Sequence, residues 1–362
     1  MSKKHTYVIN VNTYTISLTA IEYTDNGYYC AFYNELKHGG IKNNFFVNPD
    51  TMLTLIENLV RSCESKLSTV IKSVYVMLPQ KFFRTKHNTI SIDTRVDVPI
   101  NKFDVNNVLN KSPLQIEDCE FIDCIPIAYR THEDYIDNPI GKETNFLEAL
   151  TVTVGILVRI KEFLLDISKR LDIEFEIMPI TTPILDKLQD ELCTYHSPRI
   201  LINVNEGATD VCYCEMKAVI ASKTIEWGEQ HFIHGIADVC EITDDEGEML
   251  LSHINLNTYE KDEYVIFTDK IKVFDSKIVN KRMVDLLEYV LKDVKDAIKS
   301  LIDDSLLPIC ITGSNIALVK GFTEICEKQL GMAVRVFSPS ILQWRTPKDY
   351  AIIGLLDKIS KN

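Results

Sequence analysis

Three short polar segments each follow an apolar, strand-like run, and each has the composition of a turn that could bind an anion. They are Asn10-Val11-Asn12-Thr13-Tyr14, Asn203-Val204-Asn205-Glu206-Gly207-Ala208-Thr209-Asp210 and Thr312-Gly313-Ser314-Asn315. Glycine and other small residues let backbone N–H groups approach a phosphate, and nearby carboxylates hold Mg²⁺ directly or through water. Asparagine is also a common turn former at strand ends, so each residue taken singly is better explained as part of a turn.

The elements around these segments predict two α/β units that begin in the same way. Residues 7–9 and 15–23 predict two strands, and a helix follows whose apolar residues share one face: Met52, Leu55, Ile56, Leu59, Val60 and Cys63. Residues 199–204 and 209–224 predict a second strand, polar turn and hairpin. The repeated order indicates duplicated domains around a cleft, although no sequence repeat accompanies it.

The rest of the chain predicts further elements of both kinds. Residues 83–165 predict a small inserted α/β unit, with strands at 89–92, 119–129 and 149–156, a turn at 138–141 and a helix at 160–171. The acidic stretch 243–262 predicts exposed turns. Helices are predicted at 230–239, at 281–302, where the apolar residues keep a helical period, at 322–330 and at 349–359, and strands at 309–311 and 334–336.

The order of these motifs resembles the actin-like ATPases, and in particular the bacterial cell-division protein FtsA. Four segments outside the polar turns carry the likeness to FtsA: His38-Gly39-Gly40-Ile41, Ile127-Ala128-Tyr129, Asn138-Pro139-Ile140-Gly141 and Tyr350-Ala351-Ile352-Ile353-Gly354-Leu355-Leu356. Each segment alone is a weak indication of the family. The resemblance depends on their order and spacing, which extend along almost the whole chain.

The resemblance implies an α/β, actin-like (ribonuclease H-like) fold of two domains, with an FtsA-type inserted subdomain in the first. It divides the chain into four parts. The first core subdomain is 1–82 with 166–196 and 348–362, the inserted subdomain is 83–165, the second core subdomain is 197–232 with 305–347, and the outer subdomain of the second half is 233–304.

The same resemblance implies a nucleotide site, for ATP or ADP with Mg²⁺, in which the usual motifs are degenerate. Asn10 and Asn203 replace the family's acidic residues, Asn12 and Asn205 replace glycines, Ser314 replaces a glycine, and Glu206 places a negative charge where a phosphate would lie. The candidate nucleotide-binding residues are Asn10, Asn12, Thr13, Asn203, Asn205, Gly207, Asp210, Glu248, Thr312, Gly313 and Ser314.

This degenerate site predicts weak or absent catalysis. Phosphoryl transfer depends on positioning and on metal electrostatics, and each lost catalytic contact costs a factor of about 10²–10³ in rate. We therefore name no catalytic residue and expect no working enzyme. Whether nucleotide occupies the site as a structural ligand is left open.

The implied function is that of an adaptor in cell division. In this family the C-terminal tail of the tubulin-like GTPase FtsZ docks on the outer subdomain, and Lys281 and Arg282 are candidates for contacts with an acidic tail. Self-assembly into actin-like filaments and contacts with other division proteins are also implied, at a cytoplasmic, peripheral location at the division site.

Two alternatives from the same superfamily stay open. One is an active ATP-dependent filament protein, which the asparagines at positions 10 and 203 argue against. The other is a pilus-assembly scaffold that binds a short peptide of a membrane partner. The inserted-subdomain signature favours FtsA, whereas the lack of a C-terminal membrane helix after Leu356 favours the pilus type; in the first case the membrane is reached through a partner or through a missing helix.

The composition excludes other classes of function. The chain has 362 residues, 46% of them hydrophobic and 25% charged, as in ordinary globular proteins. A formal net charge of −13 disfavours nucleic acid and anionic lipid as direct partners. The ten cysteines form no C-x-x-C pair and no cluster with zinc spacing, so we expect reduced, buried thiols and no metal site.

Overall fold

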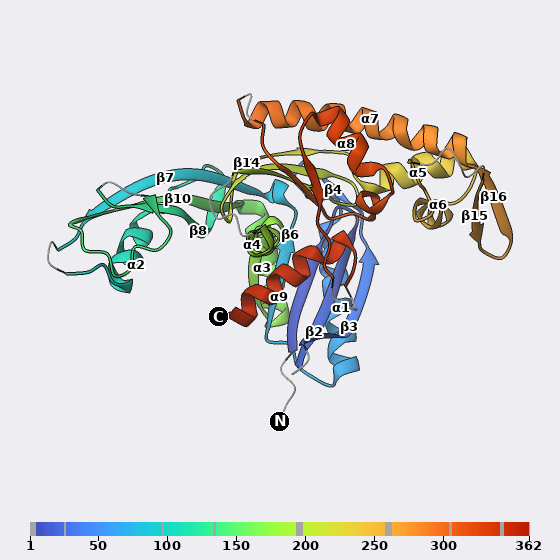
Figure 1. The fold of residues 1–362 in the computed structure, drawn as a ribbon. Coiled ribbons are helices and arrows are strands. Elements are labelled where there is room, and N and C mark those ends of the chain that lie inside the picture. Colours follow the sequence, from blue (N-terminus) through green and yellow to red (C-terminus); the bar gives the residue numbers. More distant parts are fainter. Residues whose placement is uncertain are drawn as a thin grey trace. The chain divides into compact units, whose positions relative to one another are not determined.

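The computed structural model describes residues 5–24, 27–95, 98–132, 135–192, 198–257, 263–303, 306–340 and 344–361 (Figure 1). The chain divides into two compact units. Unit 1 is Met1–Val11, Thr15–Ser197 and Cys214–Ala221, and unit 2 is Asn12–Tyr14, Pro198–Tyr213 and Ser222–Asn362. The four-part division drawn from the sequence is finer than this one and stays a prediction.

Unit 1 is built on a five-stranded sheet with the order β11-β6-β1-β2-β3. Strand β1 (His5–Val11) pairs antiparallel with β2 (Thr15–Thr24) and parallel with β6 (Ser73–Leu78), β2 pairs antiparallel with β3 (Gly27–Lys37), and β6 pairs parallel with β11 (Glu174–Pro179). Residues Val8–Val11 are buried, as expected of a strand covered on both faces.

Helices α1 (Pro49–Leu67), α3 (Val158–Leu171) and α4 (Thr181–Leu192) belong to the same unit. The predicted apolar face of α1 is confirmed, because Met52, Ile56, Leu59, Val60 and Cys63 are all buried. Pro49 begins the helix, where its missing N–H costs nothing, and Ser68 ends it in a left-handed conformation. A two-stranded ladder, β4 (Ile41–Lys42) with β5 (Phe45–Phe46), precedes this helix.

A second sheet of unit 1 lies between β6 and α3 in the sequence and follows the short helix η1 (Gln80–Phe82). Its order is β7-β10-β8-β9, from β7 (Phe83–Asp93), β10 (Phe146–Leu157), β8 (Cys119–Arg130) and β9 (Tyr135–Ile136), with helix α2 (Lys102–Lys111) packed on β10 and β7. The predicted turn at 138–141 is confirmed: Asn138 Oδ1 accepts a hydrogen bond from Ile140 N, and Gly141 has a φ of +86°.

A second five-stranded sheet, most of whose residues belong to unit 2, repeats the strand order of the first. Its order is β14-β13-β12-β17-β18, from β14 (Ala218–Ile225), β13 (Thr209–Glu215), β12 (Arg199–Val204), β17 (Ile309–Thr312) and β18 (Val334–Val336). In both sheets the first strand is central, the next two extend to one side, and two parallel strands extend to the other. The duplication predicted from element order is therefore present in the topology.

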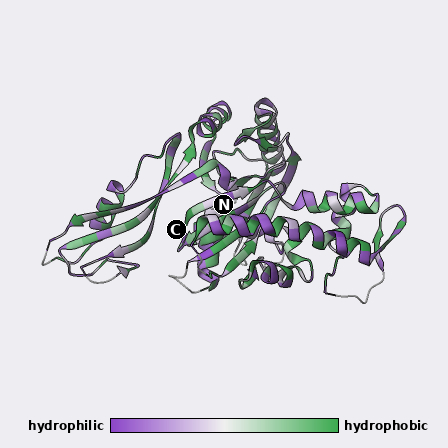
Figure 2. Ribbon diagram, turned by 90° about the horizontal axis from the view of Figure 1, so that it is seen from above, coloured by the Kyte–Doolittle hydropathy of each residue, from purple (hydrophilic) through white to green (hydrophobic). Residues whose placement is uncertain are grey.

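The helices of unit 2 are α5 (Glu229–Cys240), α6 (Asp244–Leu251), α7 (Ser276–Leu301), α8 (Phe322–Leu330) and α9 (Tyr350–Lys361), with short helices η2 (Asn315–Leu318) and η3 (Pro347–Asp349). Hydrophobic and hydrophilic residues alternate along the long helix α7, and its apolar side packs into the core of the unit (Figure 2). A hairpin of β15 (Glu263–Phe267) and β16 (Ile271–Asp275) precedes α7.

Two expectations from the sequence are wrong in detail, and one helix was not expected. The acidic stretch after 243 begins with a helix, α6, because Thr243 and Glu246 form a capping box in which each side chain accepts a hydrogen bond from the other residue's amide. Helix α7 begins at Ser276 rather than 281, because the Asp275 side chain accepts a hydrogen bond from Lys277 N. Helix α2, capped by Asn101, was not predicted. Among the described residues, no helix is both long enough and apolar enough to cross a membrane.

Candidate functional site

The first polar segment is divided between the two units. Asn10 is 8% exposed on β1, opposite Ser17 of β2 and Met77 of β6, and its Oδ1 accepts no hydrogen bond from the described residues. Asn12, Thr13 and Tyr14 belong to unit 2. Thr13 is buried, Asn12 is half-buried, and the Tyr14 side chain is largely exposed.

The second polar segment forms a chain of hydrogen bonds between its own side chains. Asn203 Nδ2 donates to Asn205 Oδ1 at 3.1 Å, and Asn205 Nδ2 donates to Asp210 Oδ2 at 3.0 Å. The second oxygen of Asp210 accepts from Thr224 Oγ1 at 2.6 Å. Asn203, Asn205 and Asp210 are nearly inaccessible to solvent. These three buried side chains are therefore bonded to one another, whereas Asn203 Oδ1, like Asn10 Oδ1, is buried and accepts no hydrogen bond from the described residues.

The turn at 205–208 packs against the start of α5. The amides of Glu229 and Gln230 donate to the carbonyl oxygens of Asn205 and Glu206, at 3.0 and 2.8 Å. A Cβ on Gly228 would lie 2.4 Å from the Asn205 oxygen, so only glycine fits there. The first amides of α5 are therefore occupied by the turn.

The same turn contacts the 12–14 segment. Tyr14 N donates to Glu206 Oε2 at 3.1 Å. A Cβ on Gly207 would lie 2.4 Å from the Tyr14 ring and 2.8 Å from the Thr13 methyl group, so both side chains lie directly against the Gly207 backbone. The structure thus places Thr13 beside the predicted site residue Gly207.

The third segment is held by the chain before α9. Thr312 Oγ1 donates to the carbonyl groups of Phe337 and Pro347, and Gly313 N also donates to the Pro347 carbonyl. Gly313 has a φ of +97°, and a Cβ there would lie 2.4 Å from Asn203 Oδ1. Ser314 Oγ accepts a hydrogen bond from Ile316 N and so caps η2. The second and third predicted segments are therefore neighbours.

Sequence reasoning missed an ion pair at this point. Glu229 is 1% exposed, and its Oε2 lies 2.6 Å from Lys348 Nζ, while its Oε1 accepts a hydrogen bond from Asn315 N at 3.1 Å. Glu229 begins α5 and Lys348 precedes α9, more than a hundred residues later. Each residue immediately precedes a predicted helix, at 230–239 and at 349–359, and no pattern in the sequence connects the two.

The charge of Lys348 is stabilised by three carboxylates. Burial alone would lower the pKa of this amine, but Glu229, followed by Glu248 and Glu206, outweighs that effect and raises the pKa above its ordinary value. The predicted site residue Glu248 is an exposed residue of α6, so its charge acts on Lys348 from the outer part of unit 2.

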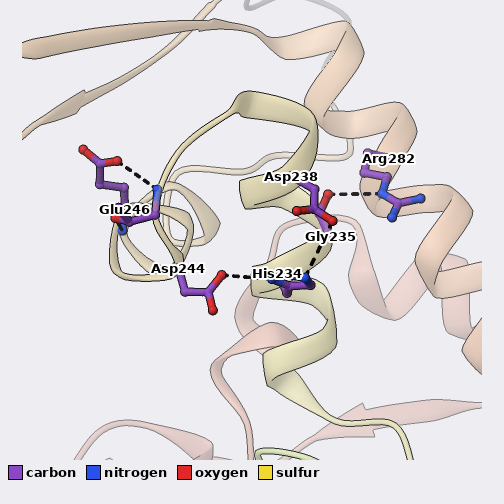
Figure 3. Close-up of polar contacts among 7 residues, drawn as sticks. His234, Gly235, Asp238, Asp244, Glu246 and Arg282 are labelled. Carbon is purple, nitrogen blue, oxygen red and sulfur yellow. Dashed lines mark hydrogen bonds and ion pairs between the residues drawn. The ribbon is translucent and has the colours of Figure 1, made fainter.

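The candidate partner residues Lys281 and Arg282 lie on α7. Arg282 is half-buried, and its Nε donates to the carbonyl of Gly235 on α5 at 3.1 Å (Figure 3). His234, one residue earlier on α5, lies 3.7 Å from Asp238 and 3.3 Å from Asp244. Arg282 thus joins α5 to α7, whereas Lys281 is exposed.

Lys281 lines a pocket of about 270 Å³ beside α7. The pocket combines two cations with polar and apolar groups: Leu256, Ser276, Lys277, Asn280, Lys281, Val284 and Asp285. Such a surface suits a short peptide that carries both an acidic and an apolar side chain.

The carboxylates around the second and third polar segments have partners within the protein. Asp210 accepts hydrogen bonds on both oxygens, and Glu229 is held by Lys348 and by Asn315 N. Within the described part of the chain, no group of three or more His, Cys, Asp or Glu side chains could hold a metal ion.

Comparison with known proteins gives the class of fold. No family model matches the sequence, and no curated protein matches it. Solved structures do match: the PilM–PilN type IV pilus biogenesis complex (10% identity, TM-score 0.57, 98% of both chains) and MreB5 of Spiroplasma citri bound to AMPPNP (10% identity, TM-score 0.56, 100% of this chain and 98% of that one). MreB5 has also been solved with ADP. The ethanolamine utilization protein EutJ from Carboxydothermus hydrogenoformans matches at 12% identity and a TM-score of 0.53, over 98% of this chain and 90% of that one.

These similarities, together with the repeated strand order, show that the chain has the mixed α/β, actin-like ATPase fold predicted from its motifs. At 9–12% identity they establish the fold alone.

Proposed function

We propose that this chain is a cell-division adaptor resembling FtsA, which binds the C-terminal tail of FtsZ through unit 2 and hydrolyses ATP weakly or not at all. The observation that carries the proposal is the hydrogen-bond chain of Asn203, Asn205 and Asp210. At three of the positions that would orient a metal and a nucleotide, the side chains are amides or a carboxylate bonded to one another, which supports weak or absent hydrolysis. We infer that a protein of this fold with little or no ATP hydrolysis functions by binding partner proteins.

The pocket beside α7 supports a peptide partner. Lys277 and Lys281 are exposed and supply positive charge, and Leu256 and Val284 supply an apolar wall. Ile278, which is 52% exposed, lies within one helical turn of Lys281 on the same helix. An acidic tail with an apolar anchor suits this surface, although Asp285 requires that the acidic groups lie on the lysine side.

The FtsA-type identity of the second sheet of unit 1 is part of the proposal. That sheet, with α2, lies between β6 and α3 in the sequence. Its strand β8 contains the motif at 127–129, and β9 precedes the motif at 138–141. We further propose self-assembly into actin-like filaments, contacts with other division proteins, and action in the cytoplasm at the division site, with the membrane reached through a partner or a membrane helix.

A pilus-assembly scaffold is the second candidate, because the PilM–PilN complex matches over 98% of both chains. Capture of full-length FtsZ by the immobilised protein, and no capture of FtsZ lacking its C-terminal tail, would support the adaptor. Equal capture of both forms, or of neither, would reject the FtsZ tail as the partner and leave the pilus-type scaffold as the better account. An ATP hydrolysis rate typical of actin-like enzymes would instead favour an active filament protein.

A further inference from the structure

The turn at 205–208 already contains an anion, and that anion is part of the chain. Glu206 Oε2 accepts the hydrogen bond of Tyr14 N at 3.1 Å. A backbone N–H that donates to a negatively charged oxygen is the contact by which turns of this kind hold a phosphate. The carboxylate therefore makes the interaction that a ligand phosphate would otherwise make.

Side chains also cover the turn. Thr13 and the Tyr14 ring lie against Gly207 so closely that a methyl group there would overlap them. Gly207 is buried, although a glycine in such a turn is the position at which a phosphate could come closest to the backbone. Thr13 and Tyr14 therefore occupy the space from which a phosphate would contact the Gly207 backbone.

Two neighbouring amides and one nearby ammonium group also have partners within the protein. The amides of Glu229 and Gln230 donate to carbonyl oxygens of the turn. Lys348, the cation of this region, pairs with the buried Glu229 carboxylate and also experiences the charges of Glu248 and Glu206. An added polyphosphate would have to compete with these carboxylates for one ammonium group.

We infer that Glu206 is a built-in substitute for a bound phosphate, and that Glu206 and Tyr14 together close the turn at 205–208 to nucleotide polyphosphates. The inference rests on the proposed function in so far as the turn is the remnant of a nucleotide motif. The inference adds that two specific residues, Glu206 and Tyr14, close the site. Substituting them should therefore allow nucleotide to bind.

The test is binding of ATP and of inorganic triphosphate, each with and without Mg²⁺, measured by calorimetry on the full chain. Four proteins are compared: wild type, Glu206→Gln, Glu206→Gly and Tyr14→Ala. Glu206→Gln keeps an oxygen that can accept from Tyr14 N and removes only the charge, whereas Glu206→Gly removes both. We expect the affinity for triphosphate to rise at least about tenfold in Glu206→Gly and to rise less in Glu206→Gln.

Tyr14→Ala removes the ring that covers the turn and leaves the Glu206 charge in place. We expect the affinity for triphosphate to rise less in this variant than in Glu206→Gly. Thermal unfolding of each variant identifies any that fails to fold; the isosteric Glu206→Gln then carries the test alone. Wild type that binds ATP as tightly as the variants, or folded Glu206 variants that bind no better than wild type, would overturn the inference.

Binding of the FtsZ tail peptide is measured on the same samples. The α7 pocket contains neither Glu206 nor Tyr14, so the inference predicts unchanged tail affinity in all four proteins. Loss of tail binding in every sample counts against the proposed function, and an unchanged nucleotide affinity counts against the role of Glu206.

Discussion

The buried carboxylate of Glu229 lies 2.6 Å from the ammonium group of Lys348, and its other oxygen accepts a hydrogen bond from Asn315 N. One side chain at the start of α5 thereby holds the segment after β17 and the segment before α9. The start of α5, whose first amides bond the carbonyl oxygens of Asn205 and Glu206, is thereby joined to the third polar segment as well as to the second.

Replacing Lys348 by methionine should destabilise the protein. The change leaves the Glu229 carboxylate buried without its cation, and removal of one partner of a buried pair costs about 3–5 kcal/mol. Because the Lys348 side chain is 38% exposed, we expect about 3 kcal/mol, measured by urea denaturation. The double variant Glu229→Gln/Lys348→Met has no unpaired charge and should recover much of the loss; a double variant as unstable as the single one would contradict this account.

The same pair predicts a dependence of stability on pH. The carboxylates, against the opposing effect of burial, raise the pKa of Lys348 above 10.5 in the folded protein. The folded state therefore holds this proton more tightly than the unfolded chain does, so the stabilisation is complete below about pH 10.5 and is lost as the pH rises through the folded-state pKa. The stability difference between wild type and Lys348→Met should shrink from pH 9 to pH 11.5; a constant difference would mean that the lysine charge contributes nothing.

Gly313→Ala should be more damaging than Gly141→Ala. Both glycines have a positive φ, +97° and +86°, so backbone strain in both variants should lower the free energy of unfolding by about 1–2 kcal/mol. Only at Gly313 would the new Cβ also lie 2.4 Å from Asn203 Oδ1 and from the Val204 carbonyl, whereas nothing lies within 4 Å of a Cβ at Gly141. We expect an additional loss of about 1–3 kcal/mol at Gly313 in thermal or urea unfolding. Equal losses of stability in the two variants would show that the backbone around Asn203 shifts at no cost to accommodate the new Cβ.

The buried cysteines should resist alkylation in the folded protein. Burial raises the pKa of Cys63 in unit 1 and of Cys326 in unit 2 to about 12. At pH 8 only about one thiol in 10⁴ is then the reactive thiolate. Iodoacetamide should modify Cys63 and Cys326 only after urea is added, whereas partly exposed Cys240 should react in buffer alone. Rapid native-state labelling of Cys63 or Cys326 would contradict their burial.

The sequence predicted the elements whose pattern is local and repeated. The apolar residues of α1 recur with helical spacing, and the strand-turn-hairpin starts of both units are bounded by glycine and asparagine turns. Those patterns were enough to suggest the fold, since the fold depends mainly on element order. Helix α6 was missed because Asp244, Asp245 and Glu246 resemble an exposed acidic loop, and only the reciprocal bonds of Thr243 and Glu246 make the segment helical.

The candidate site was less predictable, because its polar groups are connected through the fold. The sequence identifies Asn203, Asn205 and Asp210 as neighbours of a turn, but it does not say that their side chains bond to one another. The pairing of Glu229 with Lys348 joins residues far apart in the chain. Arg282 was chosen for its charge, and its bond to the Gly235 carbonyl depends on how α5 packs on α7.

The central claim is that unit 2 binds the FtsZ tail beside α7, and calorimetric titration of a tail peptide tests it most directly. Lys281→Glu is the informative variant, because Lys281 is exposed in the pocket, whereas changing Arg282 would also break its bond to Gly235. Lys299→Glu is the matched control: Lys299 is also exposed on α7 and lies about 27 Å along the helix from Lys281. We predict saturable binding by wild type and Lys299→Glu and at least about tenfold weaker binding by Lys281→Glu. No binding by wild type, or equal binding by all three proteins, would contradict the claim.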